Sequence, residues 1–241
     1  MSTVYRIGTS GWHYRHWRGP FYPDGLPVTR MLAYYCRYFD TVEINNSFYQ
    51  LPLARTLAGW RAATPPGFCF AVKGSRFITH MKKLKEPAAA LARLLPVLDA
   101  LEEKRGPLLF QLPSRWGRDA GRLAAFLAAL PSGGDYAFEF RDPSWHHPEI
   151  YALLRQHNSA FCIFDLAGFC SPLELTADFA YVRLHGPDGP YAGSYGAEAL
   201  AAWAAQLRAW RPLRVVYVYF DNDQAAHAVH NALALKRLLA E

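Results

Sequence analysis

The sequence lacks several features that define large classes of proteins. No run of about 18 uninterrupted apolar residues occurs, so no candidate membrane span is present. The first residues show no charged segment followed by a long apolar stretch, and we expect a cytoplasmic protein with no membrane partner. Cysteines are few and form no CxxC pair, which favours reduced structural thiols over a metal or cluster site at Cys36, Cys69, Cys162 and Cys170.

Charged residues are also scarce, at 19% of 241 residues, whereas hydrophobic residues make up 51%. This composition is not that of a disordered chain and supplies enough apolar side chains for a large core. No linker, low-complexity tract or short repeat divides the sequence, so we expect one domain over residues 1–241. The formal net charge of +6 favours anionic partners by long-range attraction, without separating polyanions from small molecules.

Eight strand-like runs are present, each short, rich in aromatic or β-branched residues, and followed by a polar or glycine-containing turn. They cover residues 4–10, 41–45, 68–73, 107–112, 136–140, 160–165, 180–185 and 215–220. Stretches of helical character separate most of them, at residues 29–39, 54–63, 87–104, 119–130, 147–156 and 197–210, and one more follows at 223–241. This alternation implies parallel strands with right-handed crossovers, and eight units predict a (β/α)8 barrel of TIM type.

One crossover departs from the pattern. Residues 166–179 contain Pro172 and have the character of a loop or a single turn, so we expect an irregular connection between the sixth and seventh strands. A doubly wound open sheet is the structural alternative. The first strand ends in GTSGW, which is not the glycine fingerprint that opens a phosphate-binding helix, and this favours the barrel.

Polar residues recur near the ends of the predicted strands. Because side chains alternate between the interior and the helix layer, polar residues of one parity should converge at the C-terminal mouth, where barrel enzymes build their sites. The inward candidates are four acids, three bases and four further polar residues: Glu43, Glu139, Asp165, Asp221, Lys73, Arg141, Arg183, Asn45, Gln111, His185 and Tyr219. A purely structural network of buried ion pairs is the alternative interpretation, because buried charges require partners.

The cluster suggests acid-base chemistry. Glu43 and Glu139 are the candidate acid and base, or acid and nucleophile, while His185 and Asp221 are further catalytic candidates. The bases Lys73, Arg141 and Arg183 are expected to bind phosphate or carboxylate groups, with Asn45, Gln111, Asp165 and Tyr219 as further substrate contacts. A divalent metal held by Glu139, Asp165, His185 and Asp221 is disfavoured by the adjacent cations and by the lack of an HExxH motif, and the sequence implies no other cofactor.

Two aromatic loops and one basic segment add candidate binding residues. Trp12 and Tyr14 follow the first strand, and Tyr191 follows the seventh; they would stack on a ligand or simply pack as a lid. The basic segment follows the third strand and offers a phosphate or nucleic-acid surface formed by Arg76, His80, Lys82, Lys83 and Lys85.

Seven ordered motifs resemble those of the YecE-like family, the domain of unknown function 72. They are GTSGWHYRHW with GPFYP, TVEINNSFYQLP, FAVKGSRFITH, GPLLFQLPSRW, FEFRDPSW, YVRLHG and YVYFDND, and they cover essentially the whole chain. The resemblance implies a TIM-type barrel of bacterial cytoplasmic origin. Such barrels are similar in shape to sugar isomerases and apurinic endonucleases, but His185 is the one histidine expected inside this barrel, which does not favour a metal-dependent endonuclease.

Three functions are compatible with these observations. The first is an enzyme that uses an acid-base pocket on a small anionic, sugar or sugar-phosphate substrate. The second is a nucleic-acid-binding or repair-associated protein, and the third is a non-catalytic metabolite sensor that uses the same pocket. The sequence indicates no particular oligomeric state.

Overall fold

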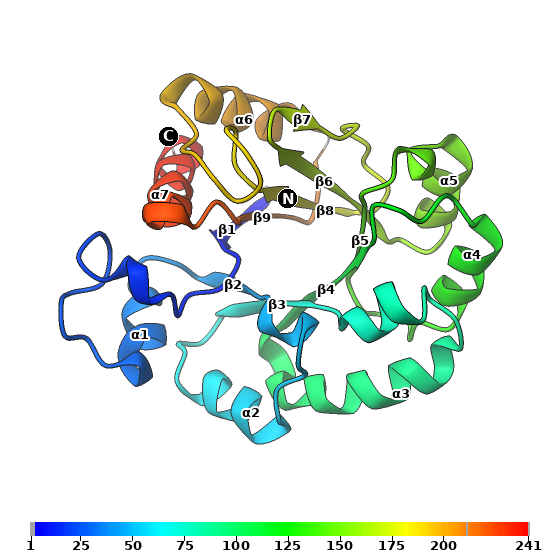
Figure 1. The fold of residues 1–241 in the computed structure, drawn as a ribbon, viewed down its shortest axis with the longest axis horizontal. Helices are drawn as coiled ribbons and strands as arrows, with labels where there is room; N and C mark the ends of the chain where they lie inside the picture. The colour runs from blue at the N-terminus through cyan, green and yellow to red at the C-terminus, as the bar shows by residue number, and fades with distance from the viewer. Residues whose placement is uncertain (1–2, 211, 241) are drawn as a thin grey trace.

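Eight parallel strands form a nearly closed barrel in the computed structural model, which describes residues 3–210 and 212–240 (Figure 1). The predicted TIM-type barrel is therefore confirmed, and the doubly wound sheet is not formed. The barrel strands are β1 (Val4–Thr9), β2 (Thr41–Ile44), β3 (Cys69–Lys73), β4 (Arg105–Leu112), β5 (Tyr136–Phe140), β6 (Ala160–Leu166), β8 (Phe179–Leu184) and β9 (Val215–Phe220). Each overlaps one predicted run, and most bounds agree to within two residues.

Within residues 3–210 and 212–240, seven α-helices surround the strands (Figure 1). Their apolar faces pack on the outward side chains of the barrel, as Leu123, Phe126 and Leu127 of α4 do. The Asp119 side chain caps the start of α4 by accepting a hydrogen bond from the Arg122 amide at 3.0 Å. The helices are α1 (Val28–Tyr35), α2 (Ala54–Ala62), α3 (Pro87–Leu98), α4 (Ala120–Ala128), α5 (Pro148–Gln156), α6 (Ala197–Ala209) and α7 (His227–Ala240).

The barrel closes at two unequal seams. Strands β1 and β9 pair in parallel over six residues, from Val4 opposite Val215 to Thr9 opposite Phe220. Strands β1 and β2 meet through one bridge between Ser10 and Glu43, where the Gly11 amide donates to the Glu43 carbonyl at 2.8 Å. A Cβ atom at Gly8 would lie 2.4 Å from the Thr41 carbonyl oxygen, so this close approach of the two strands requires glycine.

The connection between β6 and β8 is irregular, as expected. The chain turns at Ala167 and Gly168, both with positive φ, and returns along β6 as the short antiparallel strand β7 (Phe169–Cys170). Residues 171–178, all of which the structure describes, then reach β8 without a helix, and Figure 1 shows this side of the barrel covered by β7.

The interior of the barrel is divided along its axis. Its N-terminal half is filled by small and aromatic side chains such as Ala137, Ala160, Phe179 and Tyr217, whereas charged side chains fill the C-terminal half. Among the described residues, no helix combines the length and apolar character required to cross a bilayer.

Candidate functional site

The charged cluster at the C-terminal mouth is centred on Arg183 of β8. Its guanidinium group is wholly buried and contacts carboxylates from three other parts of the barrel. Nη2 donates to Glu43 Oε1 at 2.7 Å and to Asp221 Oδ2 at 3.1 Å, and Nη1 donates to Glu139 Oε2 at 2.9 Å. The structure thus brings together four residues that strand parity predicted to converge, with one cation shared by three acids.

Glu43 is fixed by two further hydroxyl donors. Ser10 Oγ donates to Oε1 at 2.5 Å, and the Tyr181 hydroxyl donates to Oε2 at 2.6 Å. Neither donor was identified from the sequence, although both share the inward parity of their strands. Burial, together with the charge of Glu43, raises the pKa of Tyr181 well above its ordinary value, so the phenol stays a proton donor to this carboxylate.

His185 links Arg141 to Asp221. Its Nδ1 lies 3.1 Å from Asp221 Oδ2, and its Nε2 lies 2.7 Å from Arg141 Nη2. A guanidinium group can only donate, so Nε2 is assigned as the acceptor of this contact and Nδ1 as the donor to Asp221. Arg141 Nε also donates to Glu139 Oε1, and the Arg141 side chain, 10% exposed, is the outermost guanidinium of the cluster.

Two of the carboxylates are held ionised. Burial alone would raise the pKa of Glu139, but Arg141 and Arg183 beside it hold that pKa well below its ordinary value. Burial would also raise the pKa of Asp221, but Arg183 and the hydrogen bond from His185 outweigh it and lower that pKa. Glu139 and Asp221 are therefore proton acceptors at neutral pH and not acids.

Lys73 is the cation of the mouth without a carboxylate partner. Its side chain is buried, and Nζ lies 4.3 Å from the centre of the Phe48 ring. Within residues 3–210 and 212–240, this amine makes no hydrogen bond or ion pair. Burial, with a contribution from Arg183, lowers the pKa of Lys73 to about 8. Asn45 and Gln111, from the ends of the flanking strands, likewise have buried side-chain oxygens, Oδ1 and Oε1, without a hydrogen-bond partner in the described structure.

Two tyrosines cover the cluster at the mouth. The Tyr14 hydroxyl donates to the Ser10 carbonyl at 2.8 Å, and its pKa is raised by burial and by the nearby Asp221. The Tyr191 ring, 45% exposed, meets the His185 ring edge to face at 5.6 Å. Both rings therefore pack over the mouth as a lid would, and their contact with a ligand stays a prediction.

Two predicted ligand contacts, Trp12 and Tyr219, lie buried away from the open mouth. Trp12 is 4% exposed and packs against Trp60 and Phe70, so its ring belongs to the core below the loop. Tyr219 does face inward, but it is wholly buried beneath the cluster, 2.7 Å from Thr41 Oγ1, with no path to a ligand.

Asp165 lies on the opposite face of β6 from the interior. It accepts a hydrogen bond from the Tyr195 hydroxyl at 3.1 Å and is paired with Cys170 in the β6–β7 turn. The inward residues of this strand are Cys162, whose Sγ lies 3.8 Å from Glu139 Oε2, and Phe164, which supports the Arg141 guanidinium at 4.7 Å. The mouth therefore holds three acids and three bases, and not the expected four acids.

Arg183 is also placed differently from its predicted role as a ligand contact. Both of its Nη atoms are occupied by carboxylates inside the barrel, so it positions other groups rather than meeting substrate. No group of three or more His, Cys, Asp and Glu side chains within residues 3–210 and 212–240 is arranged to hold a metal ion.

The basic segment surrounds a π-helical turn, Phe77–Met81, that follows β3. Arg76 and Lys85 are exposed, and Lys82 is neutralised by Glu86 at 2.7 Å. His80 packs against Phe48 at 5.0 Å, which places it beside Lys73. Lys83 adopts a left-handed conformation with φ 47°. The segment thus lies at the rim of the mouth, and its contact with nucleic acid stays a prediction.

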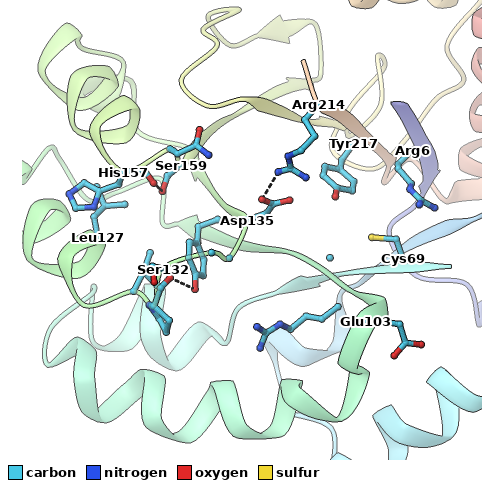
Figure 2. Close-up of a pocket in the computed structure, with 18 of the residues that line it drawn as sticks. Arg6, Cys69, Glu103, Leu127, Ser132, Asp135, His157, Ser159, Arg214 and Tyr217 are labelled. Atoms are coloured by element: carbon cyan, nitrogen blue, oxygen red, sulfur yellow. Dashed lines mark hydrogen bonds and ion pairs between the residues drawn. The ribbon is translucent and has the colours of Figure 1, made fainter. Parts of the chain in front are cut away.

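A hollow of about 910 Å³ lies at the opposite end of the barrel, where the strands begin (Figure 2). Its arginines are occupied: Arg214 Nη2 lies 2.7 Å from Asp135 Oδ1, and Arg6 Nη1 lies 3.0 Å from Asp40 Oδ2. Since this face of such barrels ordinarily serves stability, and its cations are neutralised, the hollow is not the candidate site.

The fold and the mouth together define an α/β barrel of TIM type with a buried, charge-balanced polar cluster at the C-terminal ends of its strands. The chain belongs to the family described as "Protein of unknown function DUF72", whose model matches residues 6–241. The expected resemblance to this family is confirmed.

Curated relatives and solved structures agree with this assignment. UPF0759 protein YecE of Escherichia coli is 30% identical over 147 residues, or 61% of the chain, which spans only 50% of that protein. UPF0759 protein YunF of Bacillus subtilis is 26% identical, with 97% of this chain and 94% of that one covered. A DUF72 family protein from Thermotoga maritima superposes with a TM-score of 0.90 at 29% identity, covering 99% of this chain and 100% of that one.

Proposed function

We propose that the chain is an acid-base enzyme that acts at the C-terminal mouth on a small anionic substrate, such as a sugar or a sugar phosphate. The observation that carries the proposal is the contact of Asp221, His185 and Arg141. Asp221 fixes the imidazole with its proton on Nδ1, so that the lone pair of Nε2 faces the mouth. An imidazole oriented by a carboxylate in this way is a suitable general base.

Arg141 supplies the link between binding and catalysis. It is the guanidinium nearest to solvent, and it covers His185 Nε2 at 2.7 Å. A phosphate or carboxylate group that enters the mouth draws Arg141 into a bidentate contact, because such pairs are stronger than a bond to a neutral imidazole. His185 Nε2 is then free to take a proton from the substrate.

In this proposal, Glu139 and Glu43 have different roles. Glu139 stays ionised and orients Arg141, whereas Glu43, with its hydroxyl donors Ser10 and Tyr181, is the second group able to exchange a proton with substrate. Arg183 holds all three carboxylates in place. This arrangement supports an enzyme over an inert ion-pair network, because Lys73, Asn45 and Gln111 leave polar atoms unpaired at the same mouth.

The test combines thermal stabilisation with turnover in a panel of free and phosphorylated sugars. We expect a phosphorylated sugar to raise the melting temperature of the wild type and to be converted, as followed by NMR. Arg141→Met should weaken that binding by about tenfold or more, since it removes a charge-assisted contact. His185→Asn should keep binding and lower turnover by about a hundredfold.

The matched control is Arg155→Met, which removes a surface arginine paired with Glu174 at 2.6 Å and should change neither property. Equal affinity in Arg141→Met and the wild type would contradict the proposal. Stabilisation without turnover would indicate the metabolite sensor. Salt-dependent oligonucleotide binding that Arg141→Met leaves intact would indicate the nucleic-acid-binding alternative.

A further inference from the structure

In the part of the chain that the structure describes, Lys73 and Lys104 are almost fully buried, and their surroundings differ. Lys104 is 7% exposed, and its ammonium group donates to the Thr64 and Arg61 carbonyls at 2.6 and 2.8 Å and approaches Thr64 Oγ1 at 3.1 Å. Lys73 is 6% exposed, and the described residues offer its amine only the face of Phe48. Three acceptors suit a charged ammonium, whereas an amine with none is poorly solvated as a cation.

The charged groups around Lys73 have opposing effects on the pKa of its amine. Arg183 from β8 disfavours a second positive charge, while Glu139, Glu43 and Asp221 favour it from a distance and form no ion pair with it. His80 lies on the π-helical turn beyond Phe48, and its own pKa is lowered by burial and by Lys73. The net effect is a pKa of about 8 for Lys73, so a substantial neutral fraction is present near physiological pH.

We infer that Lys73 is a nucleophile that forms an imine with an aldehyde or ketone carbon of the substrate. This inference rests on the proposed function, because it takes the mouth as the substrate site and adds the chemical class of the substrate. It replaces the anion-binding role that the sequence suggested for Lys73. A desolvated lysine in a barrel mouth, beside groups able to exchange protons, is the arrangement that this chemistry requires.

The reaction balances without any further reagent. The lone pair of neutral Nζ forms a bond to the carbonyl carbon, and the C=O π pair moves to oxygen, which takes up a proton as nitrogen loses one. The resulting carbinolamine hydroxyl accepts, through solvent, the proton that the Lys73 ammonium released on ionising, and leaves as water while the nitrogen lone pair forms the C=N bond. The products are a protonated imine on Lys73 and one water molecule.

The unpaired oxygens beside Lys73 narrow the substrate class. Asn45 Oδ1 and Gln111 Oε1 are buried acceptors on the strands that flank β3, and hydroxyl groups are donors that would satisfy them. A carbonyl compound with neighbouring hydroxyls and an anionic group would use Lys73, these two oxygens and Arg141 together. The inferred substrates are therefore open-chain hydroxy-aldehydes or hydroxy-ketones with a phosphate or carboxylate group.

The experiment is reductive trapping on the full chain. The protein is incubated with D-glyceraldehyde 3-phosphate or with glycolaldehyde in the presence of cyanoborohydride, which reduces an imine to a stable secondary amine, and the labelled lysine is found by peptide mass spectrometry. At neutral pH we expect Lys73 to be labelled about tenfold or more faster than Lys104 and the exposed Lys85, whose amines have no such environment. The rate should rise about tenfold per pH unit and level off near pH 8.

Variants separate this inference from the proposed function. Lys73→Arg keeps the positive charge and removes the nucleophile, and Lys73→Met provides a second variant if the bulkier arginine disturbs folding. We expect both to lose the label and turnover, while Lys73→Arg still shows thermal stabilisation by D-glyceraldehyde 3-phosphate. Stabilisation of the wild type without label at Lys73, or unchanged turnover in Lys73→Arg, would overturn the inference alone. Neither stabilisation nor label with any probe would overturn both.

Discussion

Arg183 is the residue on which the interior charges depend. Its two Nη atoms satisfy three carboxylates, and all four residues are 5% exposed or less. Its Nε atom is buried without a partner, so the two Nη atoms make all of the contacts of this guanidinium with the carboxylates. An apolar replacement would leave three like charges facing one another in a medium of low polarity.

Arg183→Met is therefore expected to lower the free energy of unfolding by about 3–5 kcal/mol, because it leaves buried carboxylates uncompensated. Urea denaturation followed by circular dichroism measures the change. The surface control Arg155→Met, which removes the ion pair with Glu174, should cost no more than about 1 kcal/mol. Similar losses in the two variants would show that the cluster does not depend on Arg183.

Strand parity predicted the placement of residues where polar and apolar side chains alternate, and it failed elsewhere. Glu139 and Arg141 alternate with Phe138 and Phe140, so the inward face of β5 could be identified from the sequence. The run AFCIFD of β6 is apolar on both faces, which is typical of a fully buried parallel strand, so the sequence pattern does not reveal that Asp165 faces away from the interior. Trp12 could not be distinguished from a ligand contact, because a loop gives no periodic signal.

The segment between β6 and β8 contains no helix, and it is held against β6 by hydrogen bonds from its side chains. Ser171 Oγ accepts a hydrogen bond from the Phe164 amide at 2.9 Å. Thr176 Oγ1 accepts from the Phe161 amide at 2.7 Å and donates to the Ser159 carbonyl at 2.7 Å. These two hydroxyls are hydrogen-bonded to two amides of β6 and to the carbonyl of Ser159, which precedes the strand. The irregular segment can therefore cover β6 without leaving these backbone groups unpaired.

Thr176→Val keeps the shape of the side chain and removes both hydrogen bonds. We expect a loss of about 1–3 kcal/mol in unfolding free energy, because a buried amide and a buried carbonyl lose their partner. The control Thr56→Val, at an exposed position of α2, should stay within about 0.5 kcal/mol. Equal effects in chemical denaturation would refute the structural role of this hydroxyl.

The elements themselves were largely predictable. Their order, type and approximate bounds follow from the alternation of short apolar runs with amphipathic stretches, and Pro172 correctly indicated the irregular crossover. The π-helical turn Phe77–Met81 was missed, since five residues contain too little periodicity to define it. The pairing of Tyr181 and Ser10 with Glu43 depends on how the barrel closes, which no local pattern encodes.

At the scale of the whole molecule, the buried acids link stability to pH. The folded-state pKa values of Glu139 and Asp221 lie below their ordinary values of 4.5 and 3.8, so the unfolded chain binds more protons in the acid range. Their contribution to stability is complete above those ordinary values and is lost as the pH falls toward the folded-state values. Asp135, Asp165 and Asp223, whose pKa values burial raises, act in the opposite direction.

We expect the free energy of unfolding to fall as the pH drops below about 4.5, and Glu139→Gln to reduce that slope by up to about 1.4 kcal/mol per pH unit. Denaturant titrations across the acid range measure the slope, which is independent of any overall loss of stability in the variant. Asp221→Asn offers a second test, and Glu174→Gln, at an acid whose side chain is 36% exposed, serves as the control. An unchanged slope in both buried variants would exclude these carboxylates as the source of acid sensitivity.

The unequal seams of the barrel set an order of events during synthesis. Strand β1 finds its extended partner only in β9, and the single bridge from Ser10 to Glu43 completes the circle on the other side. Asp221, which orients His185, follows directly after β9. The other members of the charged cluster all precede Asp221 in the sequence, so a nascent chain on the ribosome carries Arg183 and His185 before it carries the carboxylate that contacts both of them.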